Sequence, residues 1–135
     1  MSFNLYAAFE KKLEDGAKEF PIGEDAFITL MPAGGDKARR AFEQMMEPYA
    51  IRLNNGLKLT PEENKALNVR FYAETIVKGW RGLFDAGGKE IVYSSDACKQ
   101  LLADPKLEPF FAMLIRISSD DASFEAAKTE SDVGN

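Results

Sequence analysis

The chain has 135 residues, of which 45% are hydrophobic and 29% are charged, and its formal net charge is −5. This size and composition predict one globular domain, residues 1–135, that can bury a core of its own. Because the chain has no histidine and a single cysteine, a structural zinc site and the histidine-based catalytic triads are excluded. We therefore expect no enzyme activity, no metal and no cofactor.

The charge and hydropathy patterns also bear on partners and location. No apolar run approaches the roughly 18 residues that a transmembrane helix needs, and the N-terminal stretch lacks the basic region of a signal peptide. The acidic side chains outnumber the basic ones by 22 to 17, and no large basic face is evident. We therefore expect a cytoplasmic protein that binds neither membranes nor nucleic acid.

The N-terminal part predicts a short helix and a hairpin. Residues 2–13 begin with a serine cap and carry apolar side chains on one helical face. Two short apolar runs within residues 17–31 then flank residues 23–25, which is typical of a β-hairpin. Pro21 should place the first strand at an edge, because proline has no backbone N–H. We expect this hairpin to be the only sheet, with residues 90–93 as a strand that could join it.

The next segment predicts a helix with a break. Asp36 follows a glycine loop and can act as the N-cap of a helix with apolar residues in line. Pro48 falls inside this pattern, and proline removes a helical hydrogen bond, so the helix should break near Met46. Asn54-Asn55-Gly56 then supplies a C-cap and a turn.

The strongest helix-start signal opens the central segment, residues 60–104. Thr60 is placed as an N-cap, Pro61 occupies the first helical position, and Glu63 can complete a capping box. Apolar residues then recur at helical spacing as far as Phe84, which predicts one continuous helix that carries the only tryptophan of the chain. These apolar residues would form a stripe along one face of the helix and should anchor the core. The expected anchors are Tyr72, Ile76, Trp80 and Leu83.

Two further helices are predicted after a glycine-rich turn. Ser94 or Ser95 can cap the first, and Asp104-Pro105 repeats the combination of cap and proline at the start of the second. We therefore predict a helical core over residues 36–128 and a frayed polar tail over residues 129–135. The expected fold class is mainly α, a compact helical domain with a small N-terminal β-hairpin.

Two polar patterns could suggest ligand sites, but simpler interpretations are favoured. Gly34-Gly35 precede a helix as in phosphate-binding loops, yet the GxxxxGK[ST] spacing is absent and Asp36 would repel an anion. Asp120-Asp121 could suggest a metal site, yet adjacent carboxylates on a helix point in different directions and no EF-hand spacing is present. An ordinary loop and solvated helix caps account for both patterns.

The second half of the chain carries more large apolar side chains than one helix face can hide. The adjacent pairs Leu101-Leu102 and Phe110-Phe111 project about 100° apart around a helix. Two interpretations remain open, a core with two sides and a groove or self-association surface. The candidate residues of a partner or self-association surface are Phe84, Tyr93, Leu101, Phe110, Phe111, Leu114 and Phe124.

Three short segments carry a resemblance to a known family. They are Trp80-Arg81-Gly82-Leu83-Phe84-Asp85 before a glycine-rich turn, Val92-Tyr93-Ser94 after it, and Leu101-Leu102-Ala103-Asp104 in the next helix. This pattern resembles the tail assembly chaperones of long-tailed bacteriophages, in particular the small helical type encoded before the tape measure protein. The resemblance extends over roughly residues 36–128. Val92 stands where a proline is usual and Ala97 where an asparagine is usual, and neither change alters the expected capped turn.

The resemblance implies a non-enzymatic assembly factor. Such a protein binds the long, apolar, helical tape measure protein, keeps it soluble and helps to recruit tail tube protein subunits. It would act in the host cell cytoplasm as a homo-oligomer and would be absent from the mature virion. The alternative is a structural head–tail completion or tail terminator protein, which shares the size and acidity but would remain in the particle.

Overall fold

A computed structural model describes residues 16–124, so the predicted helix over residues 2–13 and the predicted tail over residues 129–135 lie outside the described part. The strands are β1 (Lys18–Gly23), β2 (Ala26–Leu30) and β3 (Val77–Arg81). The α-helices are α2 (Asp36–Met46), α3 (Ala50–Asn54), α4 (Pro61–Phe71), α5 (Ser95–Ala103) and α6 (Glu108–Ser118). Short 3₁₀ turns are η2 (Glu47–Tyr49) and η4 (Pro105–Leu107), and η3 (Tyr72–Ile76) is a π-helical turn.

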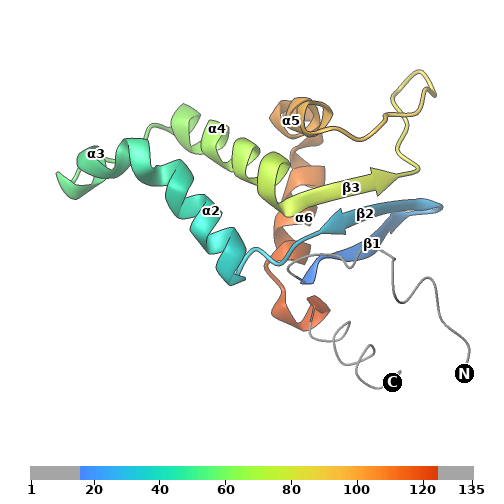
Figure 1. Cartoon of the computed structure of the whole chain (residues 1–135). Helices are drawn as coiled ribbons and strands as arrows, with labels where there is room; N and C mark the ends of the chain where they lie inside the picture. The colour runs from blue at the N-terminus through green and yellow to red at the C-terminus, as the bar shows by residue number, and fades with distance from the viewer. Residues whose placement is uncertain (1–15, 125–135) are drawn as a thin grey trace, which may run out of the picture.

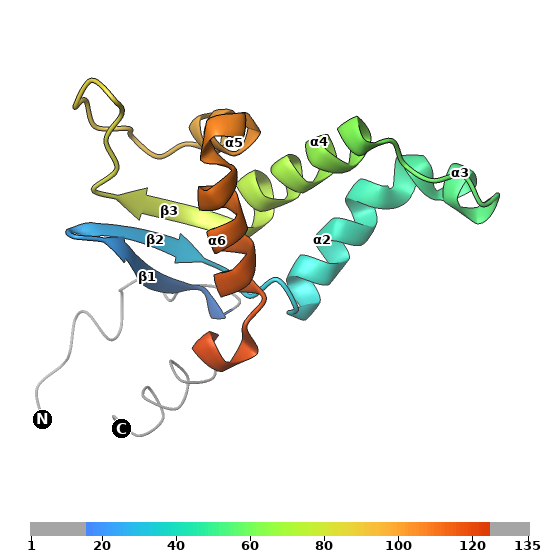
Figure 2. The same cartoon turned by 180° about the vertical axis from the view of Figure 1, so that it is seen from behind.

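The strands form one antiparallel sheet in the order β1-β2-β3 (Figure 1). The helices α2, α3 and α4 reach away from this sheet as an arm (Figure 1). Helix α6 lies across one face of the sheet, behind it in Figure 1 and in front of it in Figure 2. β1 and β2 make the predicted hairpin, and Asp25 closes its turn with a φ of 57°. Pro21 lies on β1, which is an edge strand as expected for a residue without an N–H.

The central segment shows that the predicted fold class is wrong, because the fold is mixed α and β. The predicted continuous helix ends at Phe71, passes through η3 and continues as β3, which pairs with β2. Trp80 therefore lies on a strand, and residues 36–128 do not form an all-helical core. Helices still supply most of the regular structure within residues 16–124.

Local propensity and tertiary pairing explain this change together. Thr75, Ile76 and Val77 are consecutive β-branched residues, which lowers their helix propensity, and Gly79 weakens a helix further. The hairpin offers an unpaired edge on β2, and β3 satisfies its backbone groups there. Residues 90–93 were expected as a strand that could join the sheet, but they do not join it. Glu90 instead forms an isolated bridge with Phe84.

The helix boundaries follow several of the local signals. Thr60 Oγ1 accepts a hydrogen bond from the Glu63 N–H at 3.1 Å, and a Glu63 carboxylate oxygen accepts one from the Thr60 N–H at 2.9 Å. Ser94 is the cap of α5, where its hydroxyl oxygen accepts from the Ala97 N–H at 2.9 Å. The N-cap of α2 is Gly35 rather than Asp36, which is itself the first helical residue. Helix α2 ends at Met46, before Pro48, as predicted.

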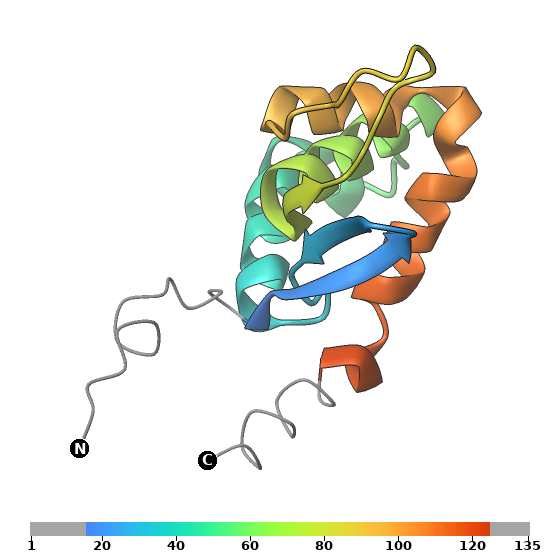
Figure 3. The same ribbon diagram turned by 90° about the vertical axis from the view of Figure 1, so that its right-hand side faces the viewer.

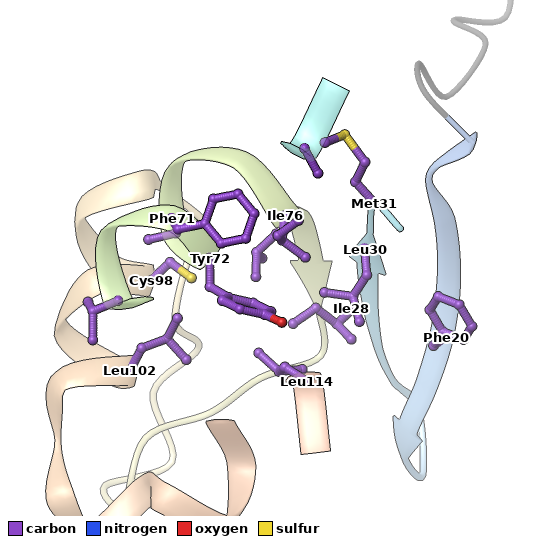
Figure 4. Packing of buried hydrophobic residues seen from close by; sticks show 14 residues of the cluster. Phe20, Ile28, Leu30, Met31, Phe71, Tyr72, Ile76, Cys98, Leu102 and Leu114 are labelled. Atoms are coloured by element: carbon purple, nitrogen blue, oxygen red, sulfur yellow. The ribbon is translucent and has the colours of Figure 1, made fainter. Parts of the chain in front are cut away.

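The core lies between the sheet and the helices α4, α5 and α6 (Figure 4). Ile28 and Leu30 of β2 are fully buried and face Ile76, and the phenol of Tyr72 makes a 3.1 Å hydrogen bond with the buried Ser118 hydroxyl. Cys98 lies in this cluster with 1% of its surface exposed, and burial raises the pKa of its thiol to about 12. The other buried apolar members are Phe20, Met31, Ala38, Val69, Phe71, Ala73, Val77, Leu102 and Leu114.

Candidate protein-binding surface

The family-like motif builds the loop that joins β3 to α5, residues 82–94, which we call the motif loop (Figure 3). Gly82 begins it with a φ of 78°, a left-handed conformation that favours glycine. A Cβ atom on Gly82 would lie 2.1 Å from the carbonyl oxygen of Asp25, in the hairpin turn. Glycine is therefore required here both by the backbone conformation and by the close approach of the hairpin.

Backbone hydrogen bonds fold the motif loop back on itself. The Ile91 N–H donates to the Leu83 carbonyl at 2.8 Å, and the Asp85 N–H donates to the Lys89 carbonyl at 2.8 Å. The Asp85 carboxylate also accepts from the Gly87 and Lys89 N–H groups, each at 2.9 Å. Asp85 thus closes the turn. Aspartate side chains commonly do so by accepting hydrogen bonds from nearby backbone N–H groups, next to glycines that allow the tight backbone.

Two aromatic side chains fasten the motif loop to β3. The Trp80 indole N–H donates to the Ile91 carbonyl at 2.7 Å, and the Tyr93 hydroxyl donates to the Val77 carbonyl at 2.9 Å. The two rings pack edge to face, with centroids 4.9 Å apart. Burial raises the pKa of Tyr93, so its phenol keeps the proton that it donates.

The fastened loop exposes two large apolar side chains. Phe84 is 61% exposed and Val92 is 78% exposed, although the residues around them are tied down. Exposed apolar side chains on a soluble protein commonly mark protein contacts, and a preordered loop loses little conformational entropy when it binds. The motif loop is therefore the first candidate binding element.

Three adjoining hollows along α4 form a second candidate, which we call the α4 groove. One, of about 520 Å³, lies between α2, α4 and α6, and includes Phe42 and Ile115. The next, of about 360 Å³, lies between α4, α5 and α6, and the third, of about 610 Å³, lies between α4 and α5. Ile115 and Asn68 line both the first and the second hollow, and Lys65 lines both the second and the third, so the three hollows adjoin one another.

A third apolar region lies at the tip of the arm. The exposed fractions of Ile51, Leu53 and Leu57 are 77%, 38% and 57%, and we call these residues the arm tip. A guanidinium N–H of Arg52 donates to a Glu63 carboxylate oxygen at 2.8 Å, which links α3 to the start of α4. The hydrogen bond from Arg52, followed by that from the Thr60 backbone, lowers the pKa of Glu63 to about 2.

The structure separates the seven side chains predicted for a partner surface. Phe84 is exposed, whereas Leu114 is fully buried in the core and does not reach the surface of this chain. Phe111 packs edge to face on Tyr72 at 5.3 Å and also lines the α4 groove, while Phe124 packs on Phe20 at 5.3 Å. The remaining three are partly buried: Tyr93, Leu101 and Phe110.

The four predicted core anchors divide into two kinds. Tyr72 and Ile76 are buried in the core cluster, at 6% and 0% exposure. Trp80 is half-buried against the edge of that cluster, and Leu83 is half-buried in the motif loop, where its carbonyl accepts the Ile91 hydrogen bond. Tyr72 and Ile76 thus hold the core, and the other two hold the loop.

The sequence did not predict that several apolar side chains would be exposed. They are Val92 in the motif loop, Ile115 in the α4 groove, and the arm-tip residues Ile51, Leu53 and Leu57. Ile51 and Leu53 stand beside the Asn54-Asn55-Gly56 turn, and that position was the available signal, because apolar residues next to a surface turn have few partners. Ile115 carried no such signal, since it belongs to the apolar pattern of α6.

Two further properties of the chain bear on the class of protein. Within residues 16–124, no group of three or more acidic or cysteine side chains is placed to hold a metal ion. None of the helices in this part of the chain combines the length and the hydropathy that crossing a bilayer requires.

The fold and its surfaces define a small mixed α and β protein that displays apolar side chains on a preordered loop and along a groove. A model of the YdaY prophage protein family matches residues 33–135, which is 103 of the 135 residues. The chain therefore belongs to this family and is phage-derived. No curated protein and no solved structure matches it. The family match contains β3, the motif loop and the α4 groove, and begins after the hairpin.

Proposed function

We propose that this prophage protein is a non-enzymatic tail assembly chaperone that binds the tape measure protein, keeps it soluble and helps to recruit tail tube protein subunits. The observation that carries the proposal is the motif loop, which holds Phe84 and Val92 exposed on a fastened backbone. Two of the three segments that resemble the tail assembly chaperones, residues 80–85 and 92–94, build or fasten this loop. Membership of a prophage protein family supports a role related to phages.

The physical properties of the chain suit this role. A tape measure protein is long, helical and apolar, so a chaperone for it needs apolar contacts rather than reactive groups. The exposed apolar side chains supply such contacts, and the formal net charge of −5 would help to keep a complex in solution. We place this activity in the host cell cytoplasm, where tail assembly takes place.

Co-expression tests the proposal directly. The tape measure protein of the same prophage is expressed alone, with the chain, and with a Phe84→Ser, Val92→Ser double variant. The chain should raise the soluble yield of the tape measure protein and co-purify with it, and the double variant should lose most of both effects. The matched control is Ile51→Ser with Leu57→Ser, which removes as many exposed apolar side chains at the arm tip and should retain both effects.

Two outcomes would contradict the proposal. An unchanged soluble yield without co-purification would exclude the tape measure protein as the partner. Mass spectrometry of purified particles supplies the second test, because a chaperone should be absent from the virion. Stoichiometric amounts in the particle would instead indicate the structural head–tail completion or tail terminator protein. Self-association stays a prediction, which analytical ultracentrifugation of the full chain can test.

A further inference from the structure

We infer that the outward face of α2 pairs with the same face of a second copy of this chain, with the two helices antiparallel across a two-fold axis. The pairing goes beyond the proposed function, because it needs no tape measure protein. The sequence predicts self-association, and this pairing gives it a defined surface and a defined register.

Helix α2 carries apolar and charged residues on opposite faces. Ala38 belongs to the buried core cluster, and Phe42 and Met45 pack against that cluster, so this face points inwards. Arg40 and Glu47 are exposed and lie on the other side of the helix at 100° per residue. Glu47 follows α2 with helical dihedral angles, a φ of −52° and a ψ of −43°. The outward face therefore presents a cation and an anion two turns apart, about 10 Å along the axis.

The charges of this segment change from basic to acidic along the helix. Residues 36–40 contain three basic side chains and one acidic one, whereas residues 43–47 contain two acidic side chains and no basic one. The segment thus has no net charge in a chain that carries −5. An antiparallel second copy would set the basic end of each helix against the acidic end of the other, where two acidic chains repel each other little.

Arg40 and Glu47 are the charges available for such contacts. Arg39 is engaged within its own helix, because its guanidinium lies 3.5 Å from the Asp36 carboxylate and 3.1 Å from that of Glu43. Arg40 and Glu47 form no ion pair within the part of the chain that the structure describes. In an antiparallel pair, the contact of Arg40 with the partner's Glu47 is repeated by the reverse contact. A two-fold axis midway between the two positions generates both contacts at once.

Exposed apolar side chains add the contact energy that surface ion pairs lack. Figure 1 shows that the chain bends at η2, so that α3 projects from the outward side of α2, away from α4. Ile51 on α3 is 77% exposed. In the register set by the two charge contacts, Ile51 lies at about the level of Asp36 in the partner. A hollow of about 410 Å³ opens there, and Pro32 and Gly35 are part of its lining. Each copy therefore offers a seat for the Ile51 side chain of the other.

The pairing leaves the motif loop free to bind. The motif loop and α3 lie at opposite ends of the molecule (Figure 1). A dimer joined through α2 would therefore present two motif loops, each with Phe84 and Val92 exposed. Two linked binding sites raise the effective concentration of the second site for a long client.

Charge reversal tests the pairing on the full chain. Sedimentation equilibrium of the native chain should show a dimer whose population rises with concentration. Arg40→Glu and Glu47→Arg should each weaken the dimer by at least about ten-fold, because each places like charges at both contacts. An equimolar mixture of these two variants should associate again, since opposite charges then meet at both contacts. The control Lys78→Glu reverses an exposed charge on β3 and should leave self-association unchanged.

Further variants test the apolar contact and the register. Ile51→Ser should weaken the dimer by at least about ten-fold, whereas Val92→Ser, at a residue that is equally exposed in the motif loop, should not. Gln44→Cys lies beside the two-fold axis and should form a disulfide between two copies under mild oxidation, and Lys78→Cys should not. Cys98 is 1% exposed and does not compete. Circular dichroism verifies that each variant is folded.

Several outcomes would overturn the inference. They are a native chain that stays monomeric at every concentration, a dimer that charge reversal does not weaken, and a mixture of the two reversed variants that stays dissociated. If Val92→Ser dissociates the dimer and Ile51→Ser does not, self-association belongs to the motif loop. If the native chain is monomeric and Ile51→Ser lowers the recovery of the tape measure protein, the arm contacts the client instead of a second copy.

The proposed function can fail or stand separately. A native chain that dimerises as described but does not co-purify with the tape measure protein would contradict the proposed function alone. A native chain that is monomeric and still co-purifies with the tape measure protein would contradict the pairing alone.

Discussion

The motif loop and the arm tip both expose large apolar side chains, but different forces hold them in place. The motif loop is fastened by two half-buried aromatic rings, each of which also donates a hydrogen bond to a backbone carbonyl. The arm tip is linked to the start of α4 by the ion pair between Arg52 and Glu63, whose side chains are 38% and 28% exposed. One region is therefore positioned by packing and the other by an interaction that water can reach.

This difference decides which surface is better prepared to bind. Surface ion pairs contribute little because solvent and salt screen them and because two long side chains must be ordered. Aromatic packing with a satisfied hydrogen bond persists in water and limits the conformations of the loop before any partner arrives. The comparison explains why we assign the tape measure contact to the motif loop and use the arm tip as the control.

The largest effect is expected at the point where the motif loop leaves the sheet. Gly82→Ala should lower the free energy of unfolding by about 3 kcal/mol or more, because the residue has a φ of 78° and its Cβ would collide with the Asp25 carbonyl. Gly79→Ala on β3, three residues earlier, is the control, since a Cβ there meets nothing within 4 Å. Urea unfolding of both variants measures the difference, and equal stabilities would contradict the close approach.

The next effect concerns the anchor of the loop. Trp80→Ala should lower the free energy of unfolding by about 2–4 kcal/mol, the sum of lost aromatic burial and one lost hydrogen bond. The motif loop should also loosen, which faster amide hydrogen exchange at Ile91 would show. A variant that keeps full stability and slow exchange, but fails to bind the tape measure protein, would make Trp80 a contact residue instead.

A smaller effect is expected at the start of α4. Thr60→Ala removes the hydroxyl that accepts from the Glu63 N–H and should cost about 1 kcal/mol. Thr60→Ser retains the hydroxyl and serves as the control. The loss should appear in hydrogen exchange of the arm and leave the motif loop unchanged; a loop that loosens equally would show that the two regions are not independent.

The smallest effect is the response of the arm to acid. The pKa of Glu63 is about 2 in the folded chain and 4.5 in its ordinary state, because Arg52 and Thr60 stabilise the carboxylate. Since the folded pKa is the lower one, this contribution is present above about pH 4.5 and is lost as the pH falls towards 2. Unfolding free energies of the native chain and Glu63→Gln should therefore converge over this interval. A difference that does not depend on pH would assign the effect to capping rather than to charge.

Much of the local structure could be predicted from the sequence, because the signals involve residues a few positions apart. The capping box at Thr60, the break before Pro48 and the cap at Ser94 all depend on such short-range contacts. The hairpin was equally predictable, since the apolar runs and the turn are adjacent. The candidate site was predicted in part, because Phe84 is exposed as proposed whereas Leu114 is not.

The segment from Tyr72 to Arg81 shows where such reasoning fails. Its apolar residues fit a helical period, and nothing in the local pattern reveals that β2 offers a free edge about 50 residues earlier in the chain. Pairing with that edge satisfies the backbone and buries Val77, and these gains exceed the modest helix propensity of β-branched residues. The prediction that Trp80 lies on a helix is wrong for the same reason.

The helix starts, the helix break before Pro48, the lack of histidine and the surplus of apolar side chains can all be read from the sequence alone, because composition and near neighbours define them. Three other features become visible only in the folded chain: the central segment changes from helix to strand, Gly82 packs against the hairpin turn, and Phe84 rather than Leu114 faces outwards. These features depend on contacts between residues far apart in the chain, where backbone pairing and burial override local preference.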